Sequence, residues 1–401
     1  MAGWLEGIRV LSFTTGVAGP NAARLLAQCG AEVIKIESRR GGVDSFRFFS
    51  SQDNLDAAPR FIEANLNVLS AQLNLKHPTG VRLLCELAAK SDVVLDNFRP
   101  DVLPRLGLGP EEFRQIRPDL IVLKMPGLGS TGPKHRWGTW GITLTAFSGM
   151  TYLWNHPGQP RPVGSQAVYP DYLAAVFAPT LVLAALLYRR RTGQGLFLDL
   201  AQVELTAYLL GVSFLEIAVN GREPTPCGND WPYAAPHNCY PCLGEDRWCV
   251  IVVETDEQWR RLCAVLGRPE LADDPRYATL TRRRERLAEI DALIAAWTRQ
   301  REAHAVMHML QAAGVPCGVV QSGEDLYHDP HLRARGFIST IDHPVIGQMP
   351  VAGIPMRLPE GALAPVRSAA TLGAHNEYVF CELLGYSREQ LAAWQREGVV
   401  D

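Results

Sequence analysis

The chain has 401 residues and a formal net charge of −3 at pH 7, with 39 Lys and Arg against 42 Asp and Glu. This length predicts two domains, or one domain with a large insertion, around a sizeable core. The near balance of charge argues against strong attraction to nucleic acid or to an anionic membrane surface, so neither is expected as a partner.

The first part of the chain alternates apolar segments of strand length with helical segments. Residues 8–13 predict a buried strand, residues 14–19 a turn, and Pro20 suits the first position of a helix that runs to Cys29. A strand–helix–strand unit of this kind places its two strands in parallel. Further strands are expected at residues 32–37, 70–75, 92–97, 119–124 and 196–200. Further helices are expected at residues 78–89, 110–116, 172–192 and 202–219. We therefore predict an α/β fold with a parallel sheet.

The first strand–helix–strand unit suggests a nucleotide-binding site. Glu37 ends the second strand, where an acid binds the ribose in NAD-binding folds. However, the turn holds only Gly16 and Gly19 instead of the three-glycine fingerprint, and Arg39 and Arg40 follow Glu37 directly. Cations at this place suit a phosphate, as do the free amides at a helix start. A phosphorylated adenosine such as coenzyme A therefore fits at least as well as NADP.

Several polar residues follow predicted strands, and ligands of open α/β sheets bind beyond the carboxyl ends of the strands. These are Gly16, Arg39, Asn97, Arg99 and the glycine-rich loop at residues 125–133. One arginine at such an end is usually a solvated surface group, but several on one edge favour a phosphate site.

Asp171 stands at the start of the longest apolar helix, directly after Pro170. Arg189 to Arg191 and then Gly193 mark the end of this helix, as basic residues and a glycine cap do. Aspartate is a favoured N-cap, so Asp171 is expected to cap the helix, and we also propose it as a covalent nucleophile; the two roles are compatible. The apolar run at residues 172–188 is shorter than the ~20 residues of a membrane span, so a buried core helix is expected.

A smaller unit is expected after a polar linker at residues 221–230. It holds a strand at 248–253, helices at 256–266 and 282–297 and up to residue 313, and a strand at 317–321. Strands at 336–341 and 349–354 and a helix at 377–384 follow. The cluster of Cys227, Cys239, Cys242 and Cys249 has loose spacing for zinc, so no metal is expected. With nine cysteines widely spread and no signal pattern, a cytoplasmic protein with reduced thiols is predicted.

A set of motifs in a defined order covers nearly the whole chain. They are Gly7-Ile-Arg-Val-Leu-Ser-Phe-Thr, Ala18-Gly-Pro, Gly30-Ala-Glu-Val-Ile-Lys-Ile-Glu, Leu73-Asn-Leu-Lys, Asn97-Phe-Arg-Pro, Arg105-Leu-Gly, Tyr169-Pro-Asp, Arg191-Thr-Gly-Gln-Gly, Ala235-Pro-His, Gly314-Val-Pro-Cys-Gly and Asp329-Pro. With these motifs the sequence resembles the class III coenzyme A transferases, the formyl-CoA transferase and carnitine CoA-transferase group.

The resemblance implies a large Rossmann-like CoA-binding domain at residues 1–225, completed by residues 331–401, and a smaller α/β domain at residues 226–330. It also implies an interlocked homodimer. Asp171 falls on the family's catalytic aspartate. The expected reaction moves coenzyme A from an acyl-CoA donor to a small carboxylic acid acceptor through an aspartyl anhydride and an aspartyl-CoA thioester. The candidate CoA-binding residues, with Arg99 added from its place at the strand edge, are Val17, Ala18, Arg39, Leu73, Asn74, Leu75, Lys76, Asn97, Phe98, Arg99, Arg105 and Trp140.

The sequence departs from the family pattern at several places: no long glycine loop is seen between Asn220 and Cys249, Gly373-Ala-His375 replaces Gly-Glu-His, and two further departures concern the site. Val17 stands where some relatives have a Gln near the reacting carbonyl, so backbone amides would have to stabilise the oxyanion. Ser38 replaces an Arg, with Arg39 and Arg40 as substitutes.

Three other functions stay open. An α-methylacyl-CoA racemase would need an acid–base pair where this chain has Trp140-Gly141, with His135 and His237 as remaining bases. A CoA-binding subunit without activity and an NAD(P) oxidoreductase are the other two.

Overall fold

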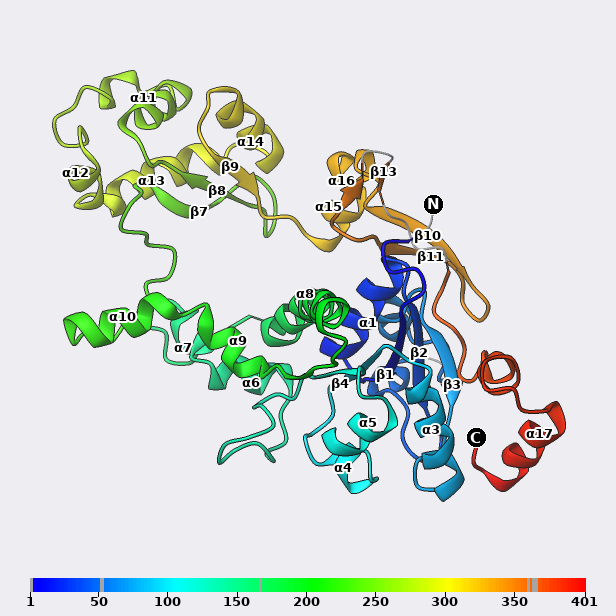
Figure 1. Cartoon of the computed structure of the whole chain (residues 1–401). Helices are drawn as coiled ribbons and strands as arrows, with labels where there is room; N and C mark the ends of the chain where they lie inside the picture. The colour runs from blue at the N-terminus through cyan, green and yellow to red at the C-terminus, as the bar shows by residue number, and fades with distance from the viewer. Residues whose placement is uncertain (1–2, 51–53, 166, 359–360, 363–366) are drawn as a thin grey trace. The chain divides into compact units, whose positions relative to one another are not determined.

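The computed structural model describes residues 3–50, 54–165, 167–358, 361–362 and 367–401. The chain forms two compact units (Figure 1). Unit 1 comprises Met1–Thr151, Gly164–Glu223 and Pro330–Asp401, and unit 2 comprises Tyr152–Val163 and Pro224–Asp329. Residues 152–163, expected in the large domain, group with unit 2 in the structure.

Unit 1 is built on a six-stranded parallel sheet with the order β3-β2-β1-β4-β5-β6. Its strands are β1 (Arg9–Phe13), β2 (Glu32–Glu37), β3 (Leu69–Gln72), β4 (Val93–Asp96), β5 (Ile121–Lys124) and β6 (Phe197–Asp199). The expected α/β class and all six expected strands are thus present. The direction of winding reverses between β1 and β4, and in such folds ligands bind beyond the strand ends at this reversal.

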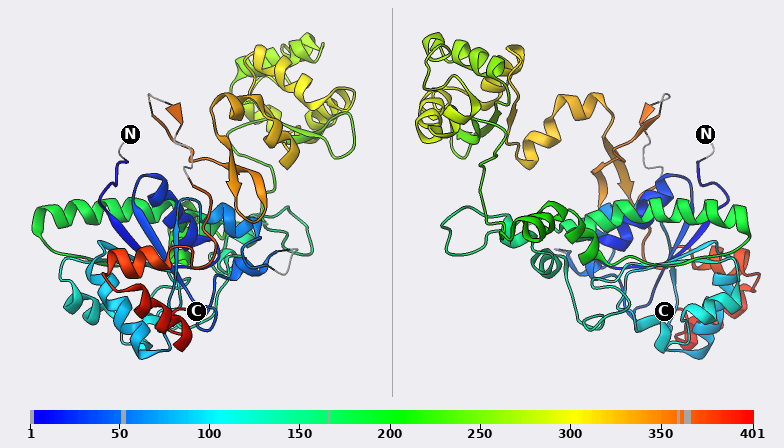
Figure 2. Two further views of the ribbon diagram at one scale, coloured as in Figure 1. Left: turned by 90° about the vertical axis from the view of Figure 1, so that its right-hand side faces the viewer. Right: turned by 60° about the vertical axis from the view of Figure 1, so that its left-hand side comes forward.

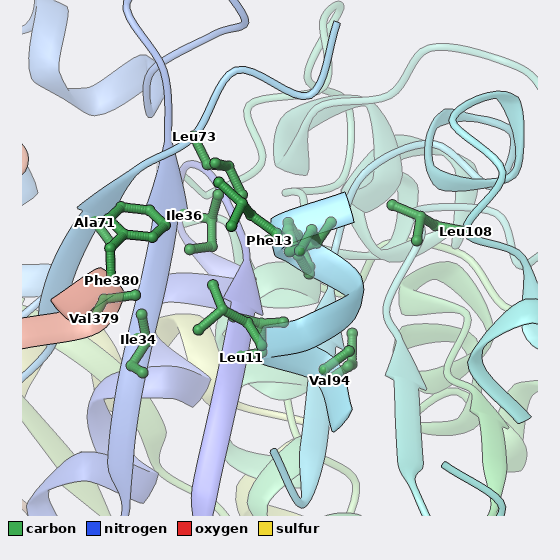
Figure 3. Close-up of a cluster of buried hydrophobic side chains, with 14 of the residues drawn as sticks. Leu11, Phe13, Ile34, Ile36, Ala71, Leu73, Val94, Leu108, Val379 and Phe380 are labelled. Atoms are coloured by element: carbon green, nitrogen blue, oxygen red, sulfur yellow. The ribbon is translucent and has the colours of Figure 1, made fainter. Parts of the chain in front are cut away.

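Helices cover both faces of the sheet, which explains why its strands are almost continuously apolar. On one face α1 (Ala18–Gln28) and the long helix α8 (Tyr169–Thr192) pack side by side over residues such as Val10 and Val33 (Figure 2). On the other face Leu11, Phe13 and Ile34 pack with residues of the C-terminal segment (Figure 3). The elements on this second face include α3 (Pro78–Ala89), α5 (Pro110–Ile116), the π-helix η3 (Tyr378–Leu383) and α17 (Arg388–Glu397).

Shorter elements complete unit 1. They are η1 (Ser45–Phe48), α2 (Pro59–Ala64), α4 (Val102–Arg105), α6 (Gly141–Phe147), α7 (Met150–Leu153), α9 (Gln202–Tyr208), α10 (Gly211–Asn220), α16 (Pro330–Ala334), the hairpin of β10 (Ile338–His343) and β11 (Gly347–Ala352), and the pair β12 (Arg357–Leu358) and β13 (Gly361–Ala362). The single helix expected at residues 202–219 is wrong, because α9 and α10 are bent by 62°. Gly211, a poor helix former, begins the second of them.

The helix α8 is long and apolar enough to cross a membrane by length and composition, and α9 with α10 would qualify as a bent pair. One side of α8 packs into the core through Ala174, Ala178, Val182 and Ala185. Phe177, Leu183 and Leu187 on other sides are exposed. The expected core helix is therefore buried along one side only.

Unit 2 is a three-stranded antiparallel sheet, β7 (His237–Pro241), β8 (Trp248–Val252) and β9 (Cys317–Val319), in the order β7-β8-β9. Its helices are α11 (Asp256–Val265), η2 (Pro269–Leu271), α12 (Leu280–Arg284), α13 (Leu287–Thr298), α14 (Ala303–Ala312) and α15 (Gly323–His328). The charged helix expected near residues 282–297 is two helices, α12 and α13, and β7 was not expected at all. Polar residues and a terminal proline hide β7 from a search for apolar alternation.

Four cysteines of unit 2 lie in its core, namely Cys242, Cys249, Cys263 and Cys317, whereas Cys239 is partly buried and Cys227 is exposed. Burial raises the pKa of the Cys242 thiol, and a hydrogen bond with Cys317 followed by burial raises that of Cys249. Neutral thiols are poor metal ligands. Among the residues that the structure describes, no three His, Cys, Asp or Glu side chains are grouped so that they could hold a metal ion.

Candidate active site

Asp171 lies in the first turn of α8, but it is not the cap of that helix. The helix begins at Tyr169, Val168 is the residue before it, and no side chain caps the helix start. The expectation that Asp171 acts as the N-cap is therefore wrong, because Pro170 fits inside the first turn and the helix starts two residues earlier. Among the residues that the structure describes, none gives the buried Oδ2 atom of Asp171 a hydrogen bond. A buried, unpaired carboxylate oxygen is costly to the fold and marks a candidate reactive group.

Two further helix starts lie next to this carboxylate. Gly141 is the first residue of α6, and a Cβ atom added there would lie 2.1 Å from Oδ2 of Asp171. The backbone N–H of Ala18, the first residue of α1, is near enough to the carboxylate to lower its pKa. The carboxylate thus lies where α1, α6 and α8 all begin. The positive ends of the helix dipoles and the free amides there favour negative charge.

Burial dominates the electrostatics of Asp171. Desolvation raises the pKa of Asp171 to about 6, and the backbone N–H groups of Ala18 and of Asp171 itself oppose this rise. A carboxylate of higher pKa is more basic, and at neutral pH it is still mostly ionised.

This pKa leads to a pH prediction. If the ionised carboxylate attacks the substrate, kcat/KM should be full above pH 7 and should fall as the pH decreases through about 6, where Asp171 takes up a proton. The sign follows from the raised pKa, because an ordinary aspartate would lose its charge only near pH 4. Initial rates between pH 4.5 and 8.5, with CoA affinity measured at each pH as the control, would check this. A flat profile down to pH 5 would contradict it.

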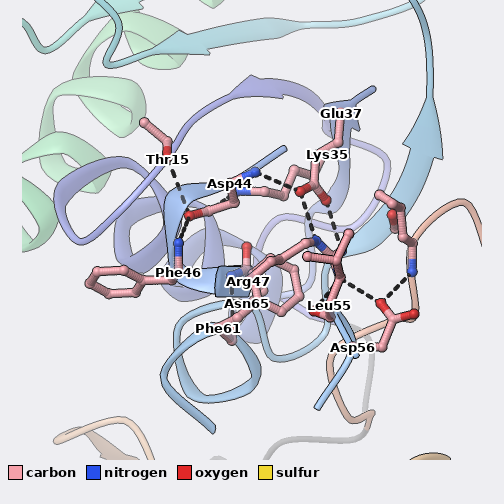
Figure 4. Close-up of polar contacts among 12 residues, drawn as sticks. Thr15, Lys35, Glu37, Asp44, Phe46, Arg47, Leu55, Asp56, Phe61 and Asn65 are labelled. Carbon is pink, nitrogen blue, oxygen red and sulfur yellow. Dashed lines mark hydrogen bonds and ion pairs between the residues drawn. The ribbon is translucent and has the colours of Figure 1, made fainter. Parts of the chain in front are cut away.

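A buried charged cluster lies under the loop that follows β2 (Figure 4). Arg47 is fully buried and donates to both carboxylate oxygens of Glu37, each at 2.8 Å. Arg47 also binds Asp56 at 2.6 Å and stacks 3.6 Å from the centre of the Phe61 ring. Both carboxylate oxygens of Glu37 are therefore bound by Arg47 and are not free to bind a ribose. This argues against NAD(P) binding at the first strand–helix–strand segment.

The loop after β2 carries the predicted phosphate-binding arginines, and both side chains are exposed. The carboxylate of Asp401 accepts hydrogen bonds from the Ser38 hydroxyl at 2.7 Å and from the backbone N–H groups of Arg39 and Arg40 at 3.1 and 2.8 Å. The amides and the hydroxyl of this turn can thus hold an anionic oxygen. In the structure a carboxylate of the chain itself does so.

The side chains at residues 73–76, predicted to contact CoA, differ in their surroundings: the first three pack or bond within the chain and the last is exposed. Leu73 is buried in the core, Leu75 packs against it, and Asn74 is buried and donates to the backbone of Gly398. Lys76 is exposed and its Nζ donates to the Arg40 carbonyl at 3.1 Å. The structure therefore brings Lys76 beside the arginine turn, whereas the side chains of Leu73 and Asn74 hold the fold.

The remaining predicted residues lie beyond β4 and at the start of α6. Phe98 is half-buried, Arg99 is exposed, and Arg105 is exposed and paired with Asp101. Trp140 precedes Gly141 and exposes 65% of its side chain beside the Asp171 region. Asn97 does not point to solvent as a free ligand, because its side-chain amide binds the backbone of Thr15.

Three residues of this region were not singled out from the sequence. They are Gly141, which packs against Asp171, and the buried pair of Lys35 and Asp44 beneath the turn before α1. A lysine inside an otherwise apolar strand was a signal for the pair, because a buried lysine needs a partner. Nothing in the sequence indicated the close approach of Gly141.

The CoA-transferase family III pattern matches residues 5–376. The chain belongs to the class III CoA-transferase family. It is 34% identical to a protein named succinyl-CoA--D-citramalate CoA-transferase from Chloroflexus aurantiacus, over 99% of this chain and 98% of that one. It is 30% identical to the succinate--glutarate CoA-transferase of Agrobacterium fabrum, over 94% of this chain and 95% of that one.

A crystal structure of a CAIB/BAIF family protein from Brucella suis has the same fold. It is 27% identical, with a TM-score of 0.86 over 96% of this chain and 100% of that one. The resemblance found in the sequence is thus confirmed, and the protein is an enzyme of the class III CoA-transferases.

Proposed function

We propose that this CoA-transferase uses Asp171 as its covalent nucleophile and exchanges coenzyme A between two carboxylic acids. The observation that carries the proposal is the buried Oδ2 atom of Asp171, which has no partner and lies against the starts of α1 and α6. A structural carboxylate at this depth would be paired with a cation or fully hydrogen-bonded. A reactive carboxylate needs a free oxygen.

The proposed reaction has four steps, and each exchanges acyl groups of similar activation. The Asp171 carboxylate attacks the carbonyl carbon of the acyl-CoA, the carbon–sulfur bond breaks, and CoA leaves as a thiolate. The thiolate then attacks the Asp171 carbonyl of this anhydride, which releases the donor acid and forms an aspartyl-CoA thioester. The carboxylate of the acceptor acid repeats the first step on that thioester. The thiolate finally attacks the acceptor's carbonyl, which gives the new acyl-CoA and free Asp171.

Backbone amides serve as the oxyanion donors in this proposal. Each tetrahedral intermediate carries a negative oxygen, and Val17 offers no side-chain donor to it. The amides at the start of α1 have no partner within the helix, and that of Ala18 is near enough to Asp171 to lower its pKa. Preorganised donors of this kind are among the largest contributions to catalysis of acyl transfer.

For the CoA moiety we propose the exposed cations around the turn after β2, namely Arg39, Arg40 and Lys76. Arg99 and Arg105, in the segment that follows β4, are proposed with them. Charge-assisted hydrogen bonds to phosphate are strong and favour these groups. The turn amides that now bind Asp401 would suit one phosphate oxygen. CoA would then displace the Asp401 carboxylate.

Substrates of the dicarboxylate class are the first to test. The relatives named above are transferases for succinate or its CoA ester with citramalate or glutarate. The test is a screen in which succinyl-CoA is offered with single carboxylic acids and new acyl-CoAs are detected by mass. A new acyl-CoA with an equal amount of succinate supports the proposal. Hydrolysis alone, or exchange of an α-proton with deuterium from solvent without transfer, would contradict it; the latter is expected of a racemase.

An interlocked homodimer is the assembly that we propose. The helix α10 has no buried residue, and its side chains Val212, Phe214, Leu215 and Val219 are exposed. Contiguous apolar surface of this kind marks an interface.

Light scattering at micromolar concentration should therefore give a mass of two chains. Replacing Phe214 and Leu215 by Asp should lower it to that of one, because each carboxylate would have to be buried in an apolar contact. As the control, Asn220→Ala at the end of the same helix removes only a polar side chain, which donates to Glu216, and should leave the dimer intact. A wild-type protein with the mass of one chain would contradict the proposal.

A further inference from the structure

The turn between β1 and α1, residues 14–17, is held by side chains from two other segments of unit 1. We propose that Asn97 and Asp44 are positioning residues that fix this turn so that the amides at the start of α1 face Asp171. The inference rests on the proposed function, since it concerns the donors that would stabilise the reaction at Asp171. Neither residue contacts the substrate in this proposal.

Asn97 follows β4 and holds Thr15 by both ends of its side-chain amide. Its Oδ1 accepts the Thr15 backbone N–H at 2.9 Å, and its Nδ2 donates to the Thr15 carbonyl at 2.9 Å. Gly19 in the first turn of α1 lies so close that a Cβ atom there would be 2.8 Å from Cγ of Asn97. The amide thus replaces a backbone partner on one side of the turn, and α1 packs directly against it.

Asp44 holds the same turn from the loop after β2. Its Oδ1 accepts the Gly16 backbone N–H at 3.0 Å and the Phe46 backbone N–H at 2.9 Å. Its Oδ2 binds the buried Lys35 at 2.7 Å, and Lys35 also donates to the Thr14 carbonyl at 2.7 Å. Asp44 and Lys35 are 2% and 1% exposed, so both charges depend on this pairing.

These contacts divide the polar groups of the turn into two sets. The backbone groups of Thr14, Thr15 and Gly16 are bound by Lys35, Asn97 and Asp44. Ala18, two residues further on, is buried in one cluster with Ala174 of α8, and its backbone N–H is near enough to Asp171 to lower the pKa of that carboxylate. A shift of one ångström in a catalytic donor costs on the order of 100-fold in rate. The contacts that hold Thr14, Thr15 and Gly16 would therefore matter for the rate by keeping the Ala18 amide in place. A CoA ligand at Asn97 would need the amide that Thr15 already occupies.

Asn97→Ala is the first test, with succinyl-CoA as the probe. Hydroxylamine traps the acylated Asp171, and peptide mass spectrometry measures the rate of its formation in a single turnover. We expect this rate to fall about 100-fold, as for the loss of one oxyanion donor, while the Kd for CoA in calorimetry stays unchanged. Asn65→Ala is the matched control, because Asn65 is also buried and its side chain donates to the Phe61 carbonyl at 2.8 Å, away from the turn. It should lower the melting temperature without lowering the rate.

Asp44 supplies the second, graded test. Asp44→Asn keeps an oxygen for the Gly16 and Phe46 amides, and Asp44→Ala keeps none. The Asp44→Asn variant should therefore retain much more of the single-turnover rate than the Asp44→Ala variant, and the two should bind CoA with equal affinity.

The outcomes separate two failures. If wild-type enzyme forms no label on Asp171, the proposed function itself fails. If wild type labels Asp171 and Asn97→Ala labels it equally fast, or Asn97→Ala loses CoA affinity in proportion to its rate, the positioning role is overturned and the nucleophile stands.

Discussion

Replacing Asp171 by Asn should reduce CoA transfer by about three orders of magnitude or more, because the amide has no attacking carboxylate oxygen. Asn has nearly the same shape, and the side chain caps no helix in the structure, so the fold does not depend on its charge. The melting temperature should not fall. It should even rise above pH 6, since burial disfavours the ionised form of Asp171. Steady-state transfer and thermal unfolding of Asp171→Asn and Asp171→Ala would measure both effects.

Asp96 provides a matched control within the same unit. Burial also raises the pKa of Asp96 to about 6, and its Oδ2 likewise has no hydrogen-bond partner. It differs in that the Lys124 amine lies 3.4 Å away. In Asp96→Asn the Lys124 amine loses this ion pair but keeps its hydrogen bond to the Pro100 carbonyl at 2.9 Å, and the folded enzyme should keep its transfer rate. Normal transfer by Asp171→Asn, or an acyl label on another carboxylate, would overturn the assignment of the nucleophile.

Replacing Arg47 by Leu should have the largest effect on stability. Arg47 is fully buried and binds Glu37 and Asp56, so the substitution leaves carboxylates in the interior without their cation. Breaking a buried ion pair by removing one partner costs about 3–5 kcal/mol. In a unit of this size that loss lowers Tm by roughly 10 °C. Differential scanning calorimetry would measure it.

Arg47→Lys is the informative companion, because lysine keeps the charge and cannot make the bidentate contact with Glu37. It should fall between wild type and Arg47→Leu. Arg114→Ala, which removes an exposed partner of Glu111, should leave Tm unchanged. If Arg47→Leu has the same Tm as the wild type, the stability of the protein does not depend on this charged cluster.

The alternation of strands and helices in unit 1 could be predicted because fully buried parallel strands are short apolar runs. Glu32–Glu37 and Pro78–Ala89 are predicted with the bounds that the structure shows. The terminal helix α17 was missed although Ser387 and Gln390 form a capping box, a signal that the sequence carries. The strand β7 was missed because it has no apolar alternation.

The candidate site could likewise be predicted only in part. Asp171 and the start of α1 could be named because a residue type and a helix start are visible in the sequence. The contacts between them could not, since they join segments far apart in the chain: Gly141 meets Asp171, and Asn97 meets Thr15. Asn74 was expected at the ligand and instead holds the C-terminal segment. A polar residue at a strand end has the same appearance in sequence whether it binds a ligand or the chain itself.

The contact between Gly141 and Asp171 also limits how this enzyme can diverge. A racemase of this fold would need an acid–base residue at the Trp140-Gly141 position, opposite the nucleophile. Any side chain at residue 141 would begin 2.1 Å from Oδ2 of Asp171 and 2.5 Å from Cβ of Val168. A side chain at residue 141 therefore has to displace the Asp171 carboxylate or Val168. A base at this residue and Asp171 in its present position exclude one another.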